Sequence, residues 1–416
     1  MRKALIGAAV AAALAPGMAL ATDGYFQDGY GMKANGMGGV GIALPQDALA
    51  PATNPAGLTM VGDRLDVGAT LFRPVRGADI QGNPGLQGTY DGNDAQNFII
   101  PEFGYSKMIN PGLAAGVAVY GNGGMNTKYK QSPFAAFGGT SPTGVNLNQL
   151  FVSPTVAYKI NPNNSIGLAL NLAYQQFGLS GLRTSAFAGF SSDGAHFSDQ
   201  GNDSSTGWGV RIGWTGQITP AVTLGATYQT KTKMSKLSDY AGLFANQGEF
   251  DIPENYGIGI AVKTTPRLTL AADVEQINYS KVAAVGDPVD SLFAGSPFGA
   301  TNGPGFGWND VTVLKVGASY AYSDKLTLRA GFNTLKQPIP SNQTLLNILA
   351  PGVVEDQVSL GATWALSDKS EVTVAYMHAF SKTVNGSGSI PPSFGGGEAN
   401  LTMYQDSIGI AYGLKM

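Results

Sequence analysis

Apolar and polar side chains alternate with a period of two along most of the chain beyond about residue 63. In the stretch 165–178, for example, Ile166, Leu168 and Leu170 fall on one face, and the residues between them are small. This period predicts β-strands with one apolar face. The opposite face is mostly Gly, Ala, Ser and Thr in the strands of this pattern.

The breaks between these stretches alternate in length. Six short turns and seven long, polar, Gly-rich stretches follow one another without a miss, which divides the chain into fourteen strands. Most are long enough for a tilted strand to cross a bilayer. We predict the strands at 63–75, 97–109, 112–120, 149–160, 165–178, 206–218, 222–234, 254–264, 267–279, 309–322, 325–337, 356–366, 370–382 and 403–416.

An even number of strands, with tight turns at one end and long loops at the other, is typical of outer-membrane barrels. A closed barrel also leaves no unpaired sheet edge in the apolar membrane. We therefore predict an all-β fold, a 14-stranded antiparallel transmembrane β-barrel over 63–416. A soluble β-sandwich or β-solenoid is the alternative, but the regular alternation of loop lengths and the lack of a short internal repeat disfavour it.

The large apolar face of each strand is expected to contact lipid, with Trp208, Tyr105, Tyr228 and Trp364 in interfacial girdles. Charged residues of mixed sign fall on the other face, which lines the lumen. Buried ions must pair or meet water, so the favoured interpretation is a network that holds something inside the barrel. An ion-selective constriction would need clustered charge of one sign. The predicted lumen charges are Asp66, Glu102, Arg211, Asp273, Glu275, Lys315 and Arg329.

Two segments precede the barrel. Residues 1–21 have the charged start, apolar stretch and Ala-x-Ala site of a secretory signal peptide. Residues 22–62 do not alternate and are rich in Gly, with apolar residues spaced among turn signals. We predict that 22–62 form a compact hatch packed inside the barrel. A fourteen-stranded barrel is wider than the narrow eight-stranded ones and narrower than the open channels, so a segment of this size would close its lumen.

Composition limits the chemistry. The 416 residues include no cysteine, two histidines and 25 Lys+Arg against 28 Asp+Glu, for a net charge of −3. These numbers exclude disulfides and cysteine metal sites and disfavour nucleic-acid binding. We expect no metal and no cofactor. We also expect no catalytic residue, because His378 falls mid-strand on the apolar side and His196 falls in a loop, so a Ser–His pair at the rim has little support.

The N-terminal stretch from Gly31 to Gly41, followed by Asp47-Ala48 and by Asn54-Pro55-Ala56, resembles the hatch of the FadL/TodX family of outer-membrane channels for hydrophobic compounds. The segment 152–167 also resembles the family's fourth and fifth strands. The resemblance covers essentially the whole mature chain. It implies a monomer in the outer membrane of a Gram-negative bacterium, surrounded by lipid and lipopolysaccharide and inserted by the barrel-assembly machinery.

The resemblance also implies a transport mechanism. A hydrophobic molecule, either a long-chain fatty acid or an aromatic hydrocarbon, lands in an apolar groove between the third and fourth long loops. It then moves to a pocket beside the hatch and leaves sideways through a kink in the third strand. The groove candidates are Leu182, Phe187, Phe190, Leu243 and Phe244; apolar loop residues need such a reason, and loops that pack together as a cap are the alternative.

The candidates for the lateral opening are Gly121, Gly123 and Gly124, because glycines mark bulges in strands. The alternative is an ordinary start to a Gly-rich loop. Two features depart from the family pattern: the chain ends in Met416 where Phe is common, and no basic residue can be matched to a fatty-acid carboxylate. A general diffusion porin for small polar solutes is the competing function, against which the hatch-like segment argues.

Overall fold

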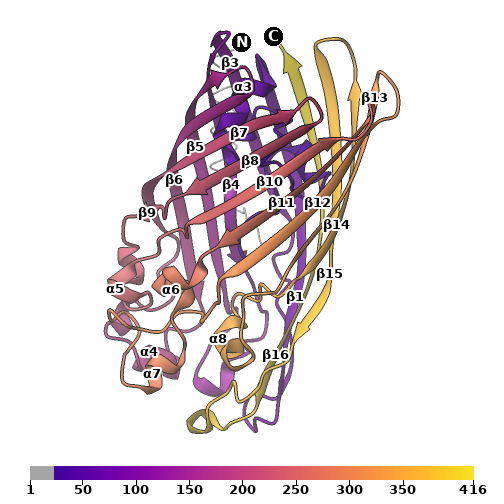
Figure 1. Cartoon of the computed structure of the whole chain (residues 1–416). Helices are drawn as coiled ribbons and strands as arrows, with labels where there is room; N and C mark the ends of the chain where they lie inside the picture. Colours follow the sequence, from indigo (N-terminus) through magenta and orange to yellow (C-terminus); the bar gives the residue numbers. More distant parts are fainter. Residues whose placement is uncertain (1–22) are drawn as a thin grey trace.

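The computed structural model describes residues 23–416. The signal peptide predicted at 1–21 lies outside them. A single antiparallel sheet closes on itself, because β1 pairs with β16 from Arg64–Lys415 to Gln81–Glu398. Figure 1 shows the tilted strands wrapping around the lumen, with the N-terminal part of the described chain inside.

Fourteen strands form the wall, and their neighbours in the sheet are also their neighbours along the chain. Two very short strands, β2 and β9, pair antiparallel beside β1 and β7 at the long-loop end. The strands are β1 Arg64–Gln81, β2 Gly88–Asp91, β3 Phe98–Asn110, β4 Leu113–Asn126, β5 Gly144–Asn161, β6 Asn164–Ser180, β7 Asp203–Thr219, β8 Val222–Gln229, β9 Lys233–Met234, β10 Asn255–Lys263, β11 Leu268–Ile277, β12 Val311–Ala321, β13 Leu326–Leu335, β14 Asp356–Ala365, β15 Ser370–Val384 and β16 Glu398–Lys415.

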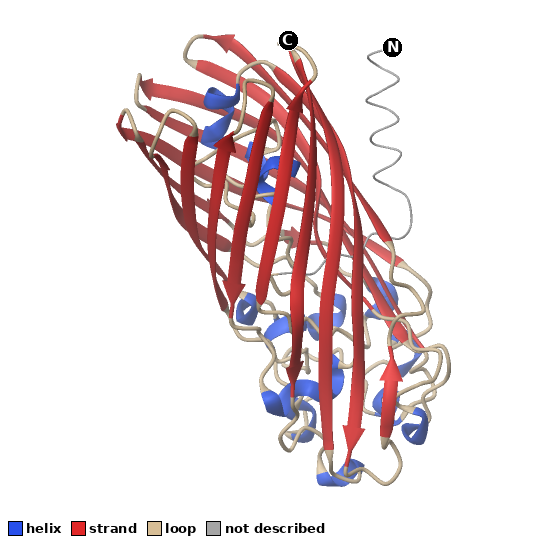
Figure 2. Cartoon of the chain, turned by 90° about the vertical axis from the view of Figure 1, so that its right-hand side faces the viewer, coloured by secondary structure: helices blue, strands red, loops and turns tan. Residues whose placement is uncertain are grey.

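The helices are single turns in two places, inside the barrel and among the long loops (Figure 2). None in the described part of the chain has the length and apolarity to cross a membrane as a helix. The α-helices are α2 Met32–Asn35, α3 Leu58–Val61, α4 Ala186–Gly189, α5 Ala245–Gly248, α6 Ala283–Gly286, α7 Asp290–Phe293 and α8 Thr344–Asn347; the 3-10 helices are η1 Ala50–Ala52, η2 Pro55–Gly57, η3 Ala135–Phe137, η4 Gly194–His196, η5 Ser238–Tyr240, η6 Tyr279–Lys281, η7 Ser341–Gln343 and η8 Pro392–Phe394.

The structure confirms the predicted fold class and the predicted order of strands. β1, β4, β5 and β16 continue further into the long loops than predicted, and β8 stops short. The predicted strand 222–234 is wrong beyond Gln229, because the chain leaves the sheet and only β9 rejoins it, on β7. The apolar alternation on which the prediction rests reports the lipid-facing part of each strand, and strands that rise above the membrane no longer need it.

The two faces of the wall follow the alternation. Ile166, Leu168 and Leu170 are 46%, 48% and 40% exposed, whereas Ala169 and Asn171, which point to the opposite face of the same strand, are fully buried. The exposed set therefore faces outward and the buried set faces a filled lumen. Trp208 and Trp364 are also exposed on the outer face, as an interfacial girdle requires.

Candidate functional site

A narrow apolar cavity lies at the long-loop end, where several loops pack over the barrel. Its volume is about 40 Å³, and every residue that lines it is apolar or glycine. Pockets for small organic ligands span ~300–1,000 Å³, so in this conformation the loops fill most of the space with their own side chains. The lining includes Phe177 and Leu179 of β6, Leu182, Phe187 and Phe197 of the loop after β6, and Leu243 and Phe244 of the loop after β9.

A run of aromatic rings leads from this cavity to the hatch. Phe244 lies 4.6 Å from Phe177 and 4.9 Å from Phe250, measured between ring centroids. Phe250 meets Tyr25 of the hatch edge-on at 6.5 Å, and Tyr25 lies 5.2 Å from Tyr279. The five rings are all buried, so apolar surface continues from the loops to the N-terminal end of the hatch.

The wall changes beside this end of the hatch. Within the described residues, β3 and β4 form no pair beyond Phe103–Val119, although β4 continues to Asn126. On its other side β4 stays paired with β5, but the register shifts between Gly121 and Gly123. The extra residue is Asn122, which makes this a β-bulge. One edge of β4 therefore lacks its strand partner at the bulge.

The hatch takes the place of that partner from inside the barrel. Phe26 forms a bridge with Gly123. The amide of Gly124 donates to the Tyr25 carbonyl at 3.0 Å, and the Gln27 amide donates to the Asn122 carbonyl at 3.3 Å. This pairing satisfies backbone groups that would otherwise be orphaned in a buried wall.

The rest of the hatch is held by charged side chains of the wall. Asp273 is an example, because its Oδ2 accepts from the backbone amides of Gly41 and Ile42 at 2.7 and 3.0 Å. Six of these wall residues bond to the hatch directly, so the lumen charges bind hatch backbone and side chains across the barrel. The contacts are Asp66 with Ala48, Glu102 with Met32, Arg211 with Thr53, Asp273 with Gly41 and Ile42, Lys315 with Asp23 and Asp28, and Arg329 with Gln46.

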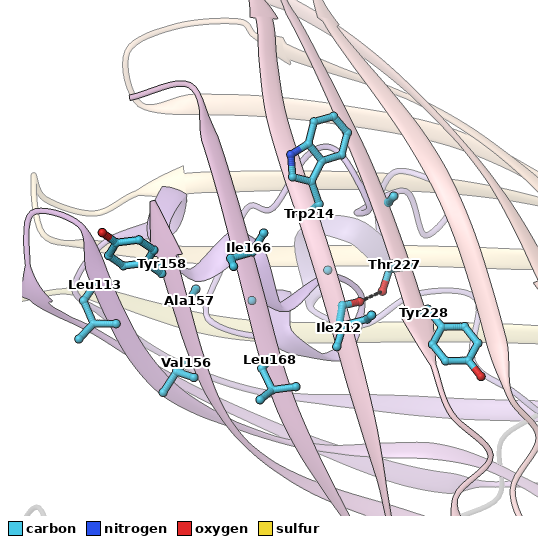
Figure 3. A pocket seen from close by; sticks show the side chains of 13 residues that line it. Leu113, Val156, Ala157, Tyr158, Ile166, Leu168, Ile212, Trp214, Thr227 and Tyr228 are labelled. Atoms are coloured by element: carbon cyan, nitrogen blue, oxygen red, sulfur yellow. Dashed lines mark hydrogen bonds between the residues drawn. The ribbon is translucent and has the colours of Figure 1, made fainter. Parts of the chain in front are cut away.

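A second depression, of about 580 Å³, lies on the outer face of the wall. Figure 3 shows Ile166, Leu168 and Ile212 around it, and these side chains are 46–50% exposed. Its floor is the directly opposed glycine pair Gly167 and Gly213. This depression faces the lipid, and the lumen behind it is occupied by the hatch.

Comparison with known proteins agrees with this architecture. The family model of the Outer membrane protein transport protein (OMPP1/FadL/TodX) matches residues 8–414. The chain belongs to this family.

Relatives of known name are distant in sequence but cover nearly the whole chain. The long-chain fatty acid transport protein of Escherichia coli O6:H1 is 23% identical over 422 residues, 89% of each chain, and that of Salmonella typhi is 24% identical over 400 residues, 87% of each. Among solved structures, the Pseudomonas putida toluene transporter TodX gives a TM-score of 0.71 and a Pseudomonas aeruginosa FadL homologue 0.72, each at 18% identity and covering 94% of this chain and 99% of the other. These structures share the fold.

Membership in the FadL/TodX family places the protein in the outer membrane of a Gram-negative bacterium. The family is one of transport channels. The long loops are therefore extracellular and the short turns periplasmic. The third extracellular loop runs from 181 to 202 and the fourth from 235 to 254.

The structure distributes the groove candidates unevenly. Leu182, Phe187, Leu243 and Phe244 line the apolar cavity. Phe190 does not; it is 44% exposed and packs edge-on against Phe394 at 5.9 Å. The four lining residues also pack on neighbouring loops, so groove and cap are the same set of side chains in this conformation.

The candidates for the lateral opening lie inside β4, although the sequence pattern predicted that the strand ends at Tyr120. Gly121 and Gly123 flank the bulge residue. An ordinary loop start does not describe this region, since the ladder with β5 continues to Asn126.

The NPA motif of the hatch lies against the wall. Asn54 caps η2, and its Nδ2 donates to the carbonyls of Ile42 and Trp214 at 2.7 and 2.9 Å.

Sequence reasoning missed part of the charge network. Glu371 of β15 accepts from Lys33 of the hatch at 2.5 Å and from Arg64 at 2.7 Å. Lys33 was visible only as part of the motif, and its partner is 338 residues away. Glu371 has small or apolar neighbours on the inner face of its strand, so alternation alone could have marked it.

Sequence reasoning also missed a row of uncharged amides on the inner wall. Gln149, Asn171, Gln175 and Gln229 are each at most 1% exposed. They stand at lumen positions of the alternation, so the pattern could have found them.

His378 lies on the outer face of the barrel, where it hydrogen-bonds to Asp406, as its position on the apolar side of the strand predicts.

Proposed function

We propose that this protein takes up hydrophobic small molecules passively across the outer membrane. Long-chain fatty acids are the first candidate and aromatic hydrocarbons the second, because the relatives named above are a long-chain fatty acid transport protein and a toluene transporter. The molecule is captured between the third and fourth loops, reaches the end of the hatch and leaves sideways into the outer leaflet.

One observation carries this proposal. The aromatic run from the loop cavity ends at Tyr25 and Phe26. The same two residues pair with the edge of β4 at the place where β3 does not pair with it. An apolar molecule that displaces this short segment meets the only stretch of the β3–β4 seam, among the described residues, where both strands are present without ladder pairs. A polar solute has no comparable path, because the hatch is bonded to the wall around the lumen.

The proposal includes a monomer in contact with lipid and lipopolysaccharide, inserted by the barrel-assembly machinery. It assigns no catalytic step, no cofactor and no metal to the chain. The lumen charges Asp66, Glu102, Arg211, Asp273, Glu275, Lys315 and Arg329 hold the hatch in this scheme.

Uptake by whole cells tests the proposal. Gram-negative cells that lack their own hydrophobe transporter and major porins are given this protein, and uptake of labelled oleate, toluene and a small sugar is measured. We expect uptake of at least one hydrophobe above the empty-vector cells, without entry of sugar. Sugar entry would mean a diffusion porin and would overturn the proposal; the hydrophobe that enters sets the substrate class.

A further inference from the structure

Three buried amide side chains form a directed chain of hydrogen bonds across the wall. Asn122, Gln149 and Gln175 stand on β4, β5 and β6 at neighbouring positions of the inner face. Asn122 Nδ2 donates to Gln149 Oε1 at 3.0 Å, and Gln149 Nε2 donates to Gln175 Oε1 at 2.7 Å. We refer to these three residues as the amide relay. They are 0%, 1% and 0% exposed, so water does not compete for these bonds.

Each end of the relay attaches to a part that must move in the proposed transport cycle. At one end Asn122 is the bulge residue of β4, and its carbonyl accepts from Gln27 and Tyr30 of the hatch. At the other end Gln175 Nε2 donates to the carbonyl of Phe250 at 3.1 Å. Phe250 belongs to the fourth extracellular loop and is the ring that joins Phe244 of the cavity to the hatch.

The loop that carries Phe250 holds backbone strain. Asn246 and Gln247 have φ of 54° and 60°, in the left-handed region that side chains rarely adopt. Their amides donate to the carbonyls of Ala300 and Gly299 in the neighbouring loop at 3.2 and 3.0 Å. The segment between Phe244 and Phe250 is thus held to the neighbouring loop by two backbone hydrogen bonds at the residues with left-handed conformation.

The relay has a direction, because every amide donates its N–H to the carbonyl of the next. When Phe250 moves away, the Gln175 Nε2 group keeps only its longer hydrogen bond, to Ser205 Oγ at 3.3 Å. The amide groups of Gln149 and then of Asn122 are no longer held in one orientation, since the orientation of each buried amide depends on the hydrogen bonds of the next. The three amide side chains therefore connect a backbone carbonyl of the fourth loop to the bulge residue of β4.

From this arrangement we propose that the amide relay couples capture of substrate in the loop cavity to opening of the β4 bulge. Substrate that enters between Phe177 and Phe244 displaces Phe250, and the relay releases Asn122 from the position in which it pairs with the hatch. Gln149 and Gln175 are positioning residues that contact no substrate. This inference rests on the proposed function, since it describes how the capture site and the exit of that transporter communicate.

The first test is uptake kinetics of Gln149→Leu and Gln175→Leu, with Gln405→Leu as the matched control. Gln405 is a buried, inward-facing residue on β16, and the only hydrogen bond of its side-chain amide among the described residues is a long one to the Met403 sulfur. Folded barrel is quantified for each variant by its heat-modifiable gel mobility, and rates are divided by it. We expect each relay variant to raise the maximal uptake rate about fivefold, the effect of losing one buried hydrogen bond that holds the bulge closed, with the half-saturating concentration unchanged.

The double variant decides between coupling and simple loss of structure. If Gln149 and Gln175 act in one chain, the double variant is no faster than either single variant. Multiplied gains, a loss of rate, or relay variants that equal Gln405→Leu would overturn the inference. In either case the wild-type protein still transports, whereas failure of the proposed function would show as a wild-type protein without uptake.

Hydrogen exchange gives an independent measurement. The wild-type barrel in lipid nanodiscs is exchanged with and without the hydrophobe that it transports, and the peptide covering residues 120–126 is followed. We expect the ligand to speed exchange in this peptide in wild type and in Gln405→Leu. In Gln175→Leu we expect exchange at the faster rate already without ligand, and no further effect of the ligand. Equal acceleration in all three proteins would show that the bulge opens without the relay.

Discussion

At the scale of single residues, the absence of a side chain decides how the hatch is seated. Gly167 and Gly213 face each other across β6 and β7 with the NPA motif directly behind them. A Cβ at Gly167 would lie 2.3 Å from the Ala56 nitrogen, and one at Gly213 would lie 1.9 Å from Asn54 Oδ1. Both contacts are far below van der Waals distance, so the motif and the wall fit only with glycine at these positions.

Gly167→Ala is expected to unseat the NPA end of the hatch, because the added methyl group meets backbone that cannot rotate away. We predict a severalfold rise in sensitivity to a large polar antibiotic and a measurable conductance in planar bilayers. Gly189→Ala is the control, since nothing lies within 4 Å of an added Cβ there. If Gly167→Ala is no more sensitive to the antibiotic and no more conductive than this control, the hatch can shift to make room for the added methyl group.

The ionised carboxylate of Asp47, in the hatch, lowers the free energy of unfolding. Burial raises its pKa to about 6, and the nearby carboxylate of Asp66 adds to the rise, while Lys33 and Arg64 oppose it. A carboxyl group with a raised pKa binds more protons in the folded than in the unfolded state between about pH 4 and 6, so this group makes the fold more stable as the pH falls through that window.

Asp47→Asn is therefore expected to raise the midpoint of thermal unfolding at pH 7.5, where the wild-type side chain is ionised. The neutral amide keeps an oxygen for the bond that Asp47 accepts from the Leu49 amide. At pH 5 the gain should shrink, because the wild-type group is then protonated. The comparison is made by circular dichroism in one detergent at both pH values; an equal gain at both would contradict the raised pKa.

At the scale of elements, β4 separates what the sequence could predict from what it could not. Alternation located the strand and its periplasmic turn, and the glycines marked a bulge. Its true end at Asn126 was missed, because Gly121, Gly123 and Gly124 carry no side chains from which alternation could be read. The partner of its free edge was also out of reach, since the hatch segment that pairs there lies about a hundred residues away in sequence.

Deleting Asn122 is expected to restore a regular β4, because it removes the one extra residue between the pairs Gly121–Leu150 and Gly123–Gln149. We predict that uptake of the transported hydrophobe falls to within about twofold of the empty-vector cells while the barrel still assembles. A deletion of Gly295, in a loop and with nothing within 4 Å of an added Cβ, controls for the loss of one residue. Undiminished uptake after deletion of Asn122 would show that the exit lies elsewhere.

At the scale of the whole molecule, the alternating pattern predicts the architecture of the barrel, whereas the contacts between the wall charges and the hatch close its lumen. The period of two and the alternating loop lengths were enough for the strand order, since both follow from crossing a membrane and returning. The sequence also marked seven lumen charges, but it could not pair them with the hatch. Lys315 and Glu275 meet because they lie on the paired strands β12 and β11. Asp23 meets Lys315 only because the hatch lies inside the barrel, and the order of strands does not specify that contact.

Removal of the hatch tests whether this network closes the barrel. Deleting residues 22–56 takes away the hatch partners of Asp66, Glu102, Arg211, Asp273, Lys315 and Arg329. Charged groups of both signs then line an emptied lumen, and water enters to solvate them because unpaired ions are not left dry. We predict stable single-channel conductance in planar bilayers where the full-length protein shows none, together with entry of a small sugar into porin-deficient cells. Hydrophobe uptake should fall, since the apolar run then ends without Tyr25 and Phe26 beside β4. A truncated barrel that inserts but stays closed would mean that the extracellular loops alone make the seal.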